Sequence, residues 1–142
     1  MSCLLWNIDD YSVKIQSIDN EHKVLVALIN DIDSVMQTHG PFHTQIILEK
    51  LANFSGSIKL HIASEERFLQ NNNYPEYTTL QLKHSDLLER LNLFESQFKA
   101  EHIAFNGDML LFLKDLLIRH IILHDRKFGN FYQDKELFSP PE

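Results

Sequence analysis

Four stretches of the chain carry apolar residues three or four positions apart, with charged and polar residues between them. This spacing gathers apolar side chains on one face of an α-helix and predicts helices over about residues 19–36, 42–70, 75–101 and 108–127. The residues that we predict to face inward are Val24, Leu25, Leu28, Ile29, Ile32, Val35, Ile47, Leu51, Phe54, Ile58, Ile62, Phe68, Leu80, Leu87, Leu91, Phe94, Phe98, Leu110, Leu113, Leu117, Ile121 and Leu123.

The segments between these stretches are short and rich in turn-forming residues. Gly40-Pro41, the stretch "NNNYP" and "FNGD" around Gly107 each interrupt the helical pattern. Short connections between long helices imply antiparallel neighbours, so the sequence predicts an all-α fold, an antiparallel up-down-up-down four-helix bundle. Residues 128–142 form a tail. Residues 1–18 form an extended N-terminal arm, which we expect to pack along the bundle through Trp6, Tyr11, Val13 and Ile15.

Composition and charge narrow the classes of function. The 142 residues suffice for one domain, and 44% apolar with 23% charged residues is ordinary for a globular protein. A net charge of −7 with scattered basic residues argues against a nucleic-acid partner. Cys3 is the only cysteine in the chain, which excludes an internal disulfide and a thiolate metal site.

Neither a secretory signal nor a membrane span is expected. The start "MSCLLWNIDDYS" has no basic region and no sustained apolar run, and "MLLFLKDLLIRHIILH" is broken by charged residues. We therefore expect a cytoplasmic protein with no membrane partner. The acidic surface favours a monomer.

Eight histidines occur, and their placement is more informative than their number. His61 and Glu65 in "HIASE" are four residues apart, about 40° around a helix, so they project from one face and can hold a first-row metal together. His22, His84 and His120 place at least one histidine on each of the other predicted helices, as bundle-core metal sites require. A single histidine on an apolar face is more often an ordinary core residue, so spacing alone leaves both interpretations open. The remaining histidines are expected in solvent: His39, His43 and His102.

The chain resembles the hemerythrin family, in its bacterial single-domain form, the bacteriohemerythrins. The resemblance spans nearly all of residues 1–142 and rests on Trp6, "IDNEHKVLVALIND", "HIASEERFL", "YPEY" followed by His84, and "HIILHDRKFG". It implies a single hemerythrin-like domain whose bundle holds two iron ions, joined by an oxo or hydroxo bridge and two carboxylates, and binds O2 reversibly. Partial iron occupancy or another first-row metal stays open, because carboxylate and imidazole ligands accept several.

The resemblance also implies which residues bind the metal. Glu65 and Asp125 match the bridging carboxylates, while His22 and His61 match the ligands of one iron. The second iron is expected to take His84 and His120. Leu28, Leu117 and Ile121 match residues that line the O2 pocket in the family.

Leu80 departs from the family pattern. It stands four residues before His84, where the family places a further histidine ligand, and an aliphatic side chain cannot coordinate a metal. Two consequences are open: the second iron keeps its place with water or hydroxide in the vacant position, or it binds weakly and is partly lost. Leu80 also makes that side of the pocket drier, which opposes a bound water.

The last helix raises a question of geometry. His120 and Asp125 are five residues apart, about 140° around a regular helix, so Asp125 reaches the site only through a widened turn. His124, four residues from His120, is the better partner on ideal geometry, but we favour Asp125 because a bridge requires a carboxylate. His124 is also the one residue placed to compensate for Leu80, although we expect it to face elsewhere.

The resemblance favours an O2-binding protein for storage or delivery over an enzyme. The alternative is a diiron redox enzyme, or a sensor of O2, NO or peroxide, that uses the coordination position vacated at Leu80. A third interpretation is a metal-depleted or mononuclear interaction module.

Overall fold

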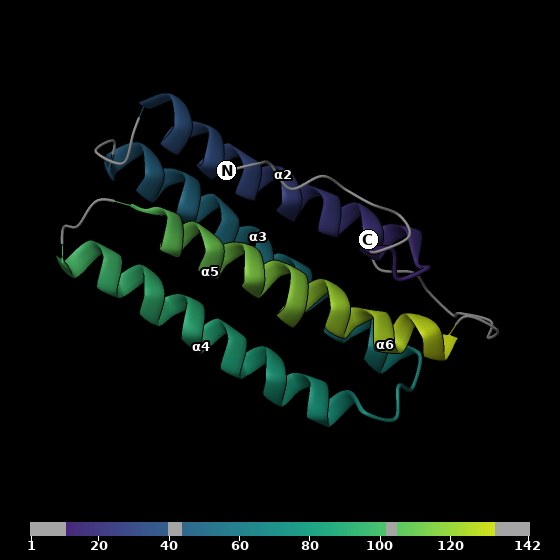
Figure 1. Cartoon of the computed structure of the whole chain (residues 1–142). Helices are drawn as coiled ribbons and strands as arrows, with labels where there is room; N and C mark the ends of the chain where they lie inside the picture. The colour runs from purple at the N-terminus through teal and green to yellow at the C-terminus, as the bar shows by residue number, and fades with distance from the viewer. Residues whose placement is uncertain (1–10, 40–43, 102–104, 133–142) are drawn as a thin grey trace.

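The computed structural model describes residues 11–39, 44–101 and 105–132, and every regular element in these ranges is a helix. The elements are α2 (Gln16–His39), α3 (Thr44–Asn71), α4 (Tyr77–Glu101), α5 (Gly107–Leu117), the π-helix η1 (Ile118–Ile122) and α6 (Leu123–Tyr132). Figure 1 shows four rods side by side, the last of them formed by α5, η1 and α6 in continuation. The all-helical prediction is confirmed for these residues. None of the described helices is long and apolar enough to cross a bilayer.

Local sequence explains where α3 ends. Asn73 adopts a left-handed conformation with φ of 57°, which asparagine tolerates better than most residues. The amide of Tyr74 donates to the carbonyl of Leu69 at 3.0 Å, and that of Asn73 donates to the carbonyl of Gln70 at 3.2 Å. These two bonds form a Schellman motif, so the "NNNYP" break ends the helix with its last carbonyls satisfied.

The start of α5 is also determined locally. The side chain of Asn106 accepts a hydrogen bond from the amide of Met109 at 3.0 Å, as an N-cap residue does.

Two apolar clusters lie along the rods. The larger includes Leu25, Phe54, Leu87 and Leu113, and the smaller includes Ile18, Phe68, Leu80, Phe128 and Val13. The packing joins α2 to α3 and α5, and α3 to α4. Val13 and Ile15 are buried as predicted, whereas Trp6 lies outside the described residues.

Most of the predicted inward positions are buried, but two predictions are wrong. Val24 is 54% exposed, because its neighbours Leu25 and Val26 take the interior positions of that turn. Leu123 is 41% exposed, because it follows the π-helix and the widened turn rotates the residues after it. Leu28, Val35 and Phe94 are only partly buried and pack against the larger cluster.

Gly129→Ala is expected to destabilise the protein by about 1–3 kcal/mol, the usual range for overpacking. A Cβ at this position in α6 would overlap the backbone oxygen of Val13, which cannot move aside as a flexible side chain can. The shift appears as a lower urea midpoint for unfolding of the metal-free protein.

Gly56→Ala is the matched control, because a Cβ at that position of α3 meets nothing within 4 Å. It should stabilise the helix by about 0.5–1 kcal/mol. If Gly129→Ala unfolded at the same urea concentration as Gly56→Ala, residues 11–15 would not be packed on α6 in solution.

Candidate metal centre

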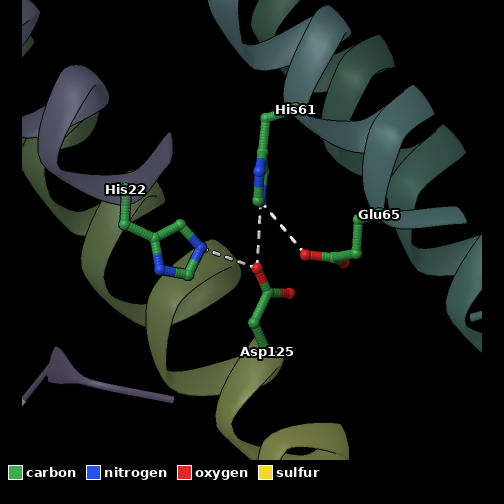
Figure 2. Close-up of side chains that lie close together, drawn as sticks. All are labelled: His22, His61, Glu65 and Asp125. Carbon is green, nitrogen blue, oxygen red and sulfur yellow. Dashed lines mark hydrogen bonds and ion pairs between the residues drawn. The ribbon is translucent and has the colours of Figure 1, made fainter. Parts of the chain in front are cut away.

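Four buried side chains from three of the rods meet between the helices. His22 comes from α2, His61 and Glu65 from α3, and Asp125 from α6 (Figure 2). Each offers one nitrogen or oxygen atom, and these atoms lie within 4.8 Å of one another. His84 on α4 extends the group, because its Nε2 lies 3.0 Å from Oε1 of Glu65.

This polar layer lies between the two apolar clusters. On each rod a member of the smaller cluster and a member of the larger one flank the polar residue along the chain. The flanking pairs, in chain order, are Ile18 and Leu25 around His22, Ile62 and Phe68 around Glu65, Leu80 and Leu87 around His84, and Ile122 and Phe128 around Asp125. The apolar residues on both sides exclude water from the layer.

Glu65 is placed to join two sides of the layer. Its Oε2 lies 3.1 Å from Nε2 of His61, and its Oε1 lies 3.0 Å from Nε2 of His84. The two oxygens of one carboxylate thus face two histidines from different helices. A carboxylate in this arrangement can bridge two cations.

The π-helix η1 brings Asp125 into the layer. The amide of Leu123 donates to the carbonyl of Ile118, five residues earlier, which is the widened turn that the sequence analysis requires. Asp125 is buried, and its Oδ2 lies 2.8 Å from Nε2 of His22 and 3.0 Å from Nε2 of His61. Between the two candidates that spacing left open, Asp125 lies in the layer, and His124 is not among the four clustered residues.

His120 lies in η1, but its side chain is outside the described part of the structure, as are those of His39, His43 and His102. Its assignment as a metal ligand therefore stays a prediction.

The residues predicted to line an O2 pocket are apolar and lie beside the layer. Leu117 and Ile121 are buried in the larger cluster, and Leu28 packs against it. Their pocket role stays a prediction.

Burial and neighbouring groups shift the pKa values of the two carboxylates in opposite directions. Burial, followed by the charge of Asp125, raises the pKa of Glu65 from its ordinary 4.5 to about 7. Burial would also raise the pKa of Asp125, but hydrogen bonds with Glu65, His22 and His61 outweigh it and lower that pKa. The layer therefore holds one carboxylate firmly ionised and another that retains a proton near neutral pH.

The pKa values of two histidines are also shifted by burial and by neighbouring carboxylates. Burial would lower the pKa of His61, but the charge of Glu65 and hydrogen bonds to Asp125 and Glu21 raise it well above 6.5. The pKa of His84 is also raised, because its bonds with Glu65 outweigh burial. Metal ions bind deprotonated ligands, so a cation entering this layer displaces protons.

Two outer carboxylates orient these rings, and neither was identified from the sequence. Nδ1 of His61 lies 2.6 Å from Oε1 of Glu21, whose other oxygen accepts from Ser64 at 3.0 Å. Nδ1 of His84 lies 2.8 Å from Oε2 of Glu66. A carboxylate at Nδ1 holds the proton there and directs the Nε2 lone pair to a metal.

The donor set fits a first-row transition metal. Imidazole nitrogens and carboxylate oxygens suit iron, manganese or zinc. Nδ1 of His22 is buried and has no hydrogen-bond partner among the described residues. Buried polar atoms without partners are rare in proteins, and the two oxygens of Glu65 each face a histidine nitrogen with which a cation could be shared.

Glu21→Ala is expected to weaken metal binding by about 10–100-fold, as losses of such outer partners commonly do. The variant frees the ring of His61 from its fixed orientation. Competition against a chromophoric chelator, with cobalt(II) as probe, measures the affinity. Glu49→Ala, at an exposed position of α3, is the control and should bind as the wild type does. Equal affinities in both variants would show that Glu21 does not orient a ligand.

The metal-free protein should lose stability as the pH rises from about 4.5 to about 7. Glu65 has its folded-state pKa raised to about 7, so its contribution is present below 4.5 and lost as the pH rises through 7. Asp125 has a lowered pKa, so its contribution is present above 3.8 and lost only as the pH falls further. Urea unfolding in the presence of a chelator measures the slope, and Glu65→Gln should reduce it. An unchanged slope in that variant would mean that Glu65 is not the group that loses a proton in this pH range.

Comparison with known proteins agrees with this geometry. A family model described as the hemerythrin HHE cation binding domain matches residues 13–131. The bacteriohemerythrin of Pseudomonas aeruginosa is 31% identical over 136 residues, which cover 94% of this chain and 82% of that protein. The bacteriohemerythrin of Methylococcus capsulatus is 22% identical over 129 residues, 91% of this chain and 96% of that protein.

Solved structures agree in fold. The crystal structure of wild-type hemerythrin matches with a TM-score of 0.80 at 21% identity, over 91% of this chain and 97% of that one. The described helices thus have the hemerythrin fold, and the resemblance identified from the sequence is confirmed. With its family model matched from residue 13 to residue 131, this chain belongs to the hemerythrin family.

Proposed function

We propose that this protein is a non-haem diiron protein that binds O2 reversibly. The observation that carries the proposal is the buried layer in which Glu65 faces His61 with one oxygen and His84 with the other. Membership of the hemerythrin family supports a non-haem iron, O2-binding type of protein. O2 storage and O2 delivery both fit this chemistry.

In this proposal each residue has one role. Glu65 and Asp125 would bridge the two ions, His22 and His61 would complete one site, and His84 and His120 would bind at the other. Leu80 stands where the family places a histidine. It is 3% exposed and packs in the smaller apolar cluster.

The scaffold of the proposal is an antiparallel up-down-up-down bundle formed by a single domain, with residues 11–15 as the described part of an N-terminal arm. The order of colours along the rods in Figure 1 supports alternating directions. The burial of Val13 against the smaller cluster supports the arm.

Held by these residues, a pair of ferrous ions would supply two electrons to O2 and would recover them on release. The chain's own residues keep this exchange reversible. Leu117 and Ile121 exclude water, which slows the loss of superoxide and protons. Glu21 and Glu66 hold the protons on Nδ1 of their histidines, so the rings keep their orientation.

We propose that O2 reaches the site from the side of His61. A cavity of about 340 Å³ lies between α2 and α3, lined by His61, Glu21 and Leu25 among others. It places His61, one of the two histidines of one proposed iron, beside solvent-reachable space. In the family pattern the matching iron has the fewer histidines, so we propose that it is the one that accepts O2.

A second candidate function rests on Leu80. If the ion at His84 lacks a ligand, both ions accept exogenous molecules, and the protein acts as a redox enzyme or as a sensor of O2, NO or peroxide. Irreversible oxidation on aeration, with consumption of added peroxide, would favour this function.

The test is metal content together with an absorption spectrum. Anaerobic loading with ferrous salt should give about two irons per chain, as in other bundle-core diiron carboxylate sites. Visible absorption should appear on aeration and disappear on deoxygenation over repeated cycles. Glu65→Gln should lose iron and the spectral change, while Glu89→Gln, at an exposed position of α4, should keep both. A wild-type protein that retains no iron after loading would contradict the proposal.

A further inference from the structure

His124 faces α4 across a small cavity. It lies on α6 immediately before Asp125, and it lines a cavity of about 30 Å³ together with Leu80 and Lys83 of α4. His124 lies outside the four clustered ligand residues, as expected, but it lines this cavity with Leu80. The widened turn of η1, which rotates Asp125 into the polar layer, also turns the preceding residue toward α4.

The ring of His124 has an unsatisfied nitrogen. Its Nε2 is buried from solvent and has no hydrogen-bond partner among the described residues, although the side chain as a whole is only partly buried. A buried polar atom without a partner costs about 1–3 kcal/mol, so such an atom calls for a ligand or a function.

The facing residue cannot supply a partner. Leu80 is aliphatic and stands one helical turn before His84, whose Nε2 lies at Glu65. The imidazole absent from α4 therefore has a counterpart that projects from α6 into the same space.

We propose that His124 supplies the imidazole that Leu80 lacks, as a ligand of the ion bound by His84. The inference rests on the proposed diiron function. It moves one ligand from α4 to α6, so the second ion keeps its histidines although position 80 is a leucine.

The movement required is small. His124 lies outside the group of four residues whose ligand atoms are within 4.8 Å, so its ring turns toward Glu65 and His84 when the ion binds. The cavity that His124 shares with Leu80, one helical turn before His84, has about the volume of one water molecule and leaves the ring room to turn. Asp125, the next residue, anchors the backbone beside the site.

The inference decides between the two candidate functions. With His124 bound, the second ion has no open position, and O2 meets only the ion held by His22 and His61. This arrangement favours reversible O2 binding over the redox-enzyme function, in which a second exogenous molecule would bind at the other ion and be oxidised.

The test uses His124→Leu in the full-length chain. After anaerobic loading with ferrous salt, the wild type should hold about two irons, and the variant should keep one and bind the other more than about 100-fold more weakly, since the loss of a ligand exceeds the loss of an outer partner. Iron per chain, chelator competition and Mössbauer spectra of ⁵⁷Fe give readouts that do not depend on O2 binding.

Two double variants make the test specific. Leu80→His in the His124→Leu background should restore the second iron, because it returns an imidazole to the cavity. Leu82→His in the same background should not, because Leu82 is 68% exposed on the same helix.

Stability separates ligand loss from structural damage. Metal-free His124→Leu should be at least as stable to urea as the wild type, since it removes a buried nitrogen without a partner. If the leucine variant does not fold, His124→Gln takes its place in the same measurements.

The outcomes are distinct. Two tightly held irons in His124→Leu, or rescue by Leu82→His as well as by Leu80→His, would overturn the inference. A wild type that holds no iron would instead contradict the proposed function. A crystal of the wild type loaded with ferrous salt should place Nε2 of His124 about 2.1 Å from the second ion, the usual metal–imidazole distance.

Discussion

Two carboxylates share one buried layer between the helices, and the arrangement of the other residues follows from their charge. Glu65 and Asp125 are both removed from water, and burying an ion costs on the order of several kcal/mol even after relaxation. The layer therefore needs positive charge. In the metal-free protein protons provide it, because Glu65 and His61 both have raised pKa values. Metal ions bind deprotonated ligands, so an ion bound by these residues would replace those protons at the same atoms.

The apolar clusters strengthen the attraction of this layer for a cation. Water would solvate the carboxylates and weaken their attraction for a cation, and residues such as Phe68 and Leu117 exclude it from opposite sides. The smaller cluster also closes the end of the molecule, where Gly129 lets α6 approach the backbone of Val13. Close packing here fixes the position of Asp125 four residues earlier. The stability of the scaffold and the geometry of the site thus depend on the same contacts.

Sequence periodicity predicted the helical class and most inward positions, such as Phe54 and Ile58, because helix burial repeats with a fixed spacing. Spacing also identified His61 and Glu65 as one face. It failed at Leu123, because a π-helix changes the period and a regular pattern cannot locate it. Asp125 came from the family resemblance and from the need for a bridging carboxylate. The pairs Glu21 with His61 and Glu66 with His84 join residues 40 and 18 positions apart, so no local pattern indicates them.

Leu80 and His124 show that residues far apart in the sequence can line the same cavity, so the position of one residue in a motif does not alone decide which side chains are available as ligands. Leu80 contributes apolar contact to the smaller cluster, and the residue across the cavity carries a nitrogen without a partner. Leu80 adds apolar contact to the metal-free fold, whereas the buried nitrogen of His124 without a partner destabilises it. If the proposed ion binds there, it would add stability at that nitrogen as well as at Glu65, which would couple retention of the ion to folding. Under the proposed ligation by His124, a chain would lose one histidine of a family motif and keep the coordination, because the backbone turns a facing residue into the same cavity.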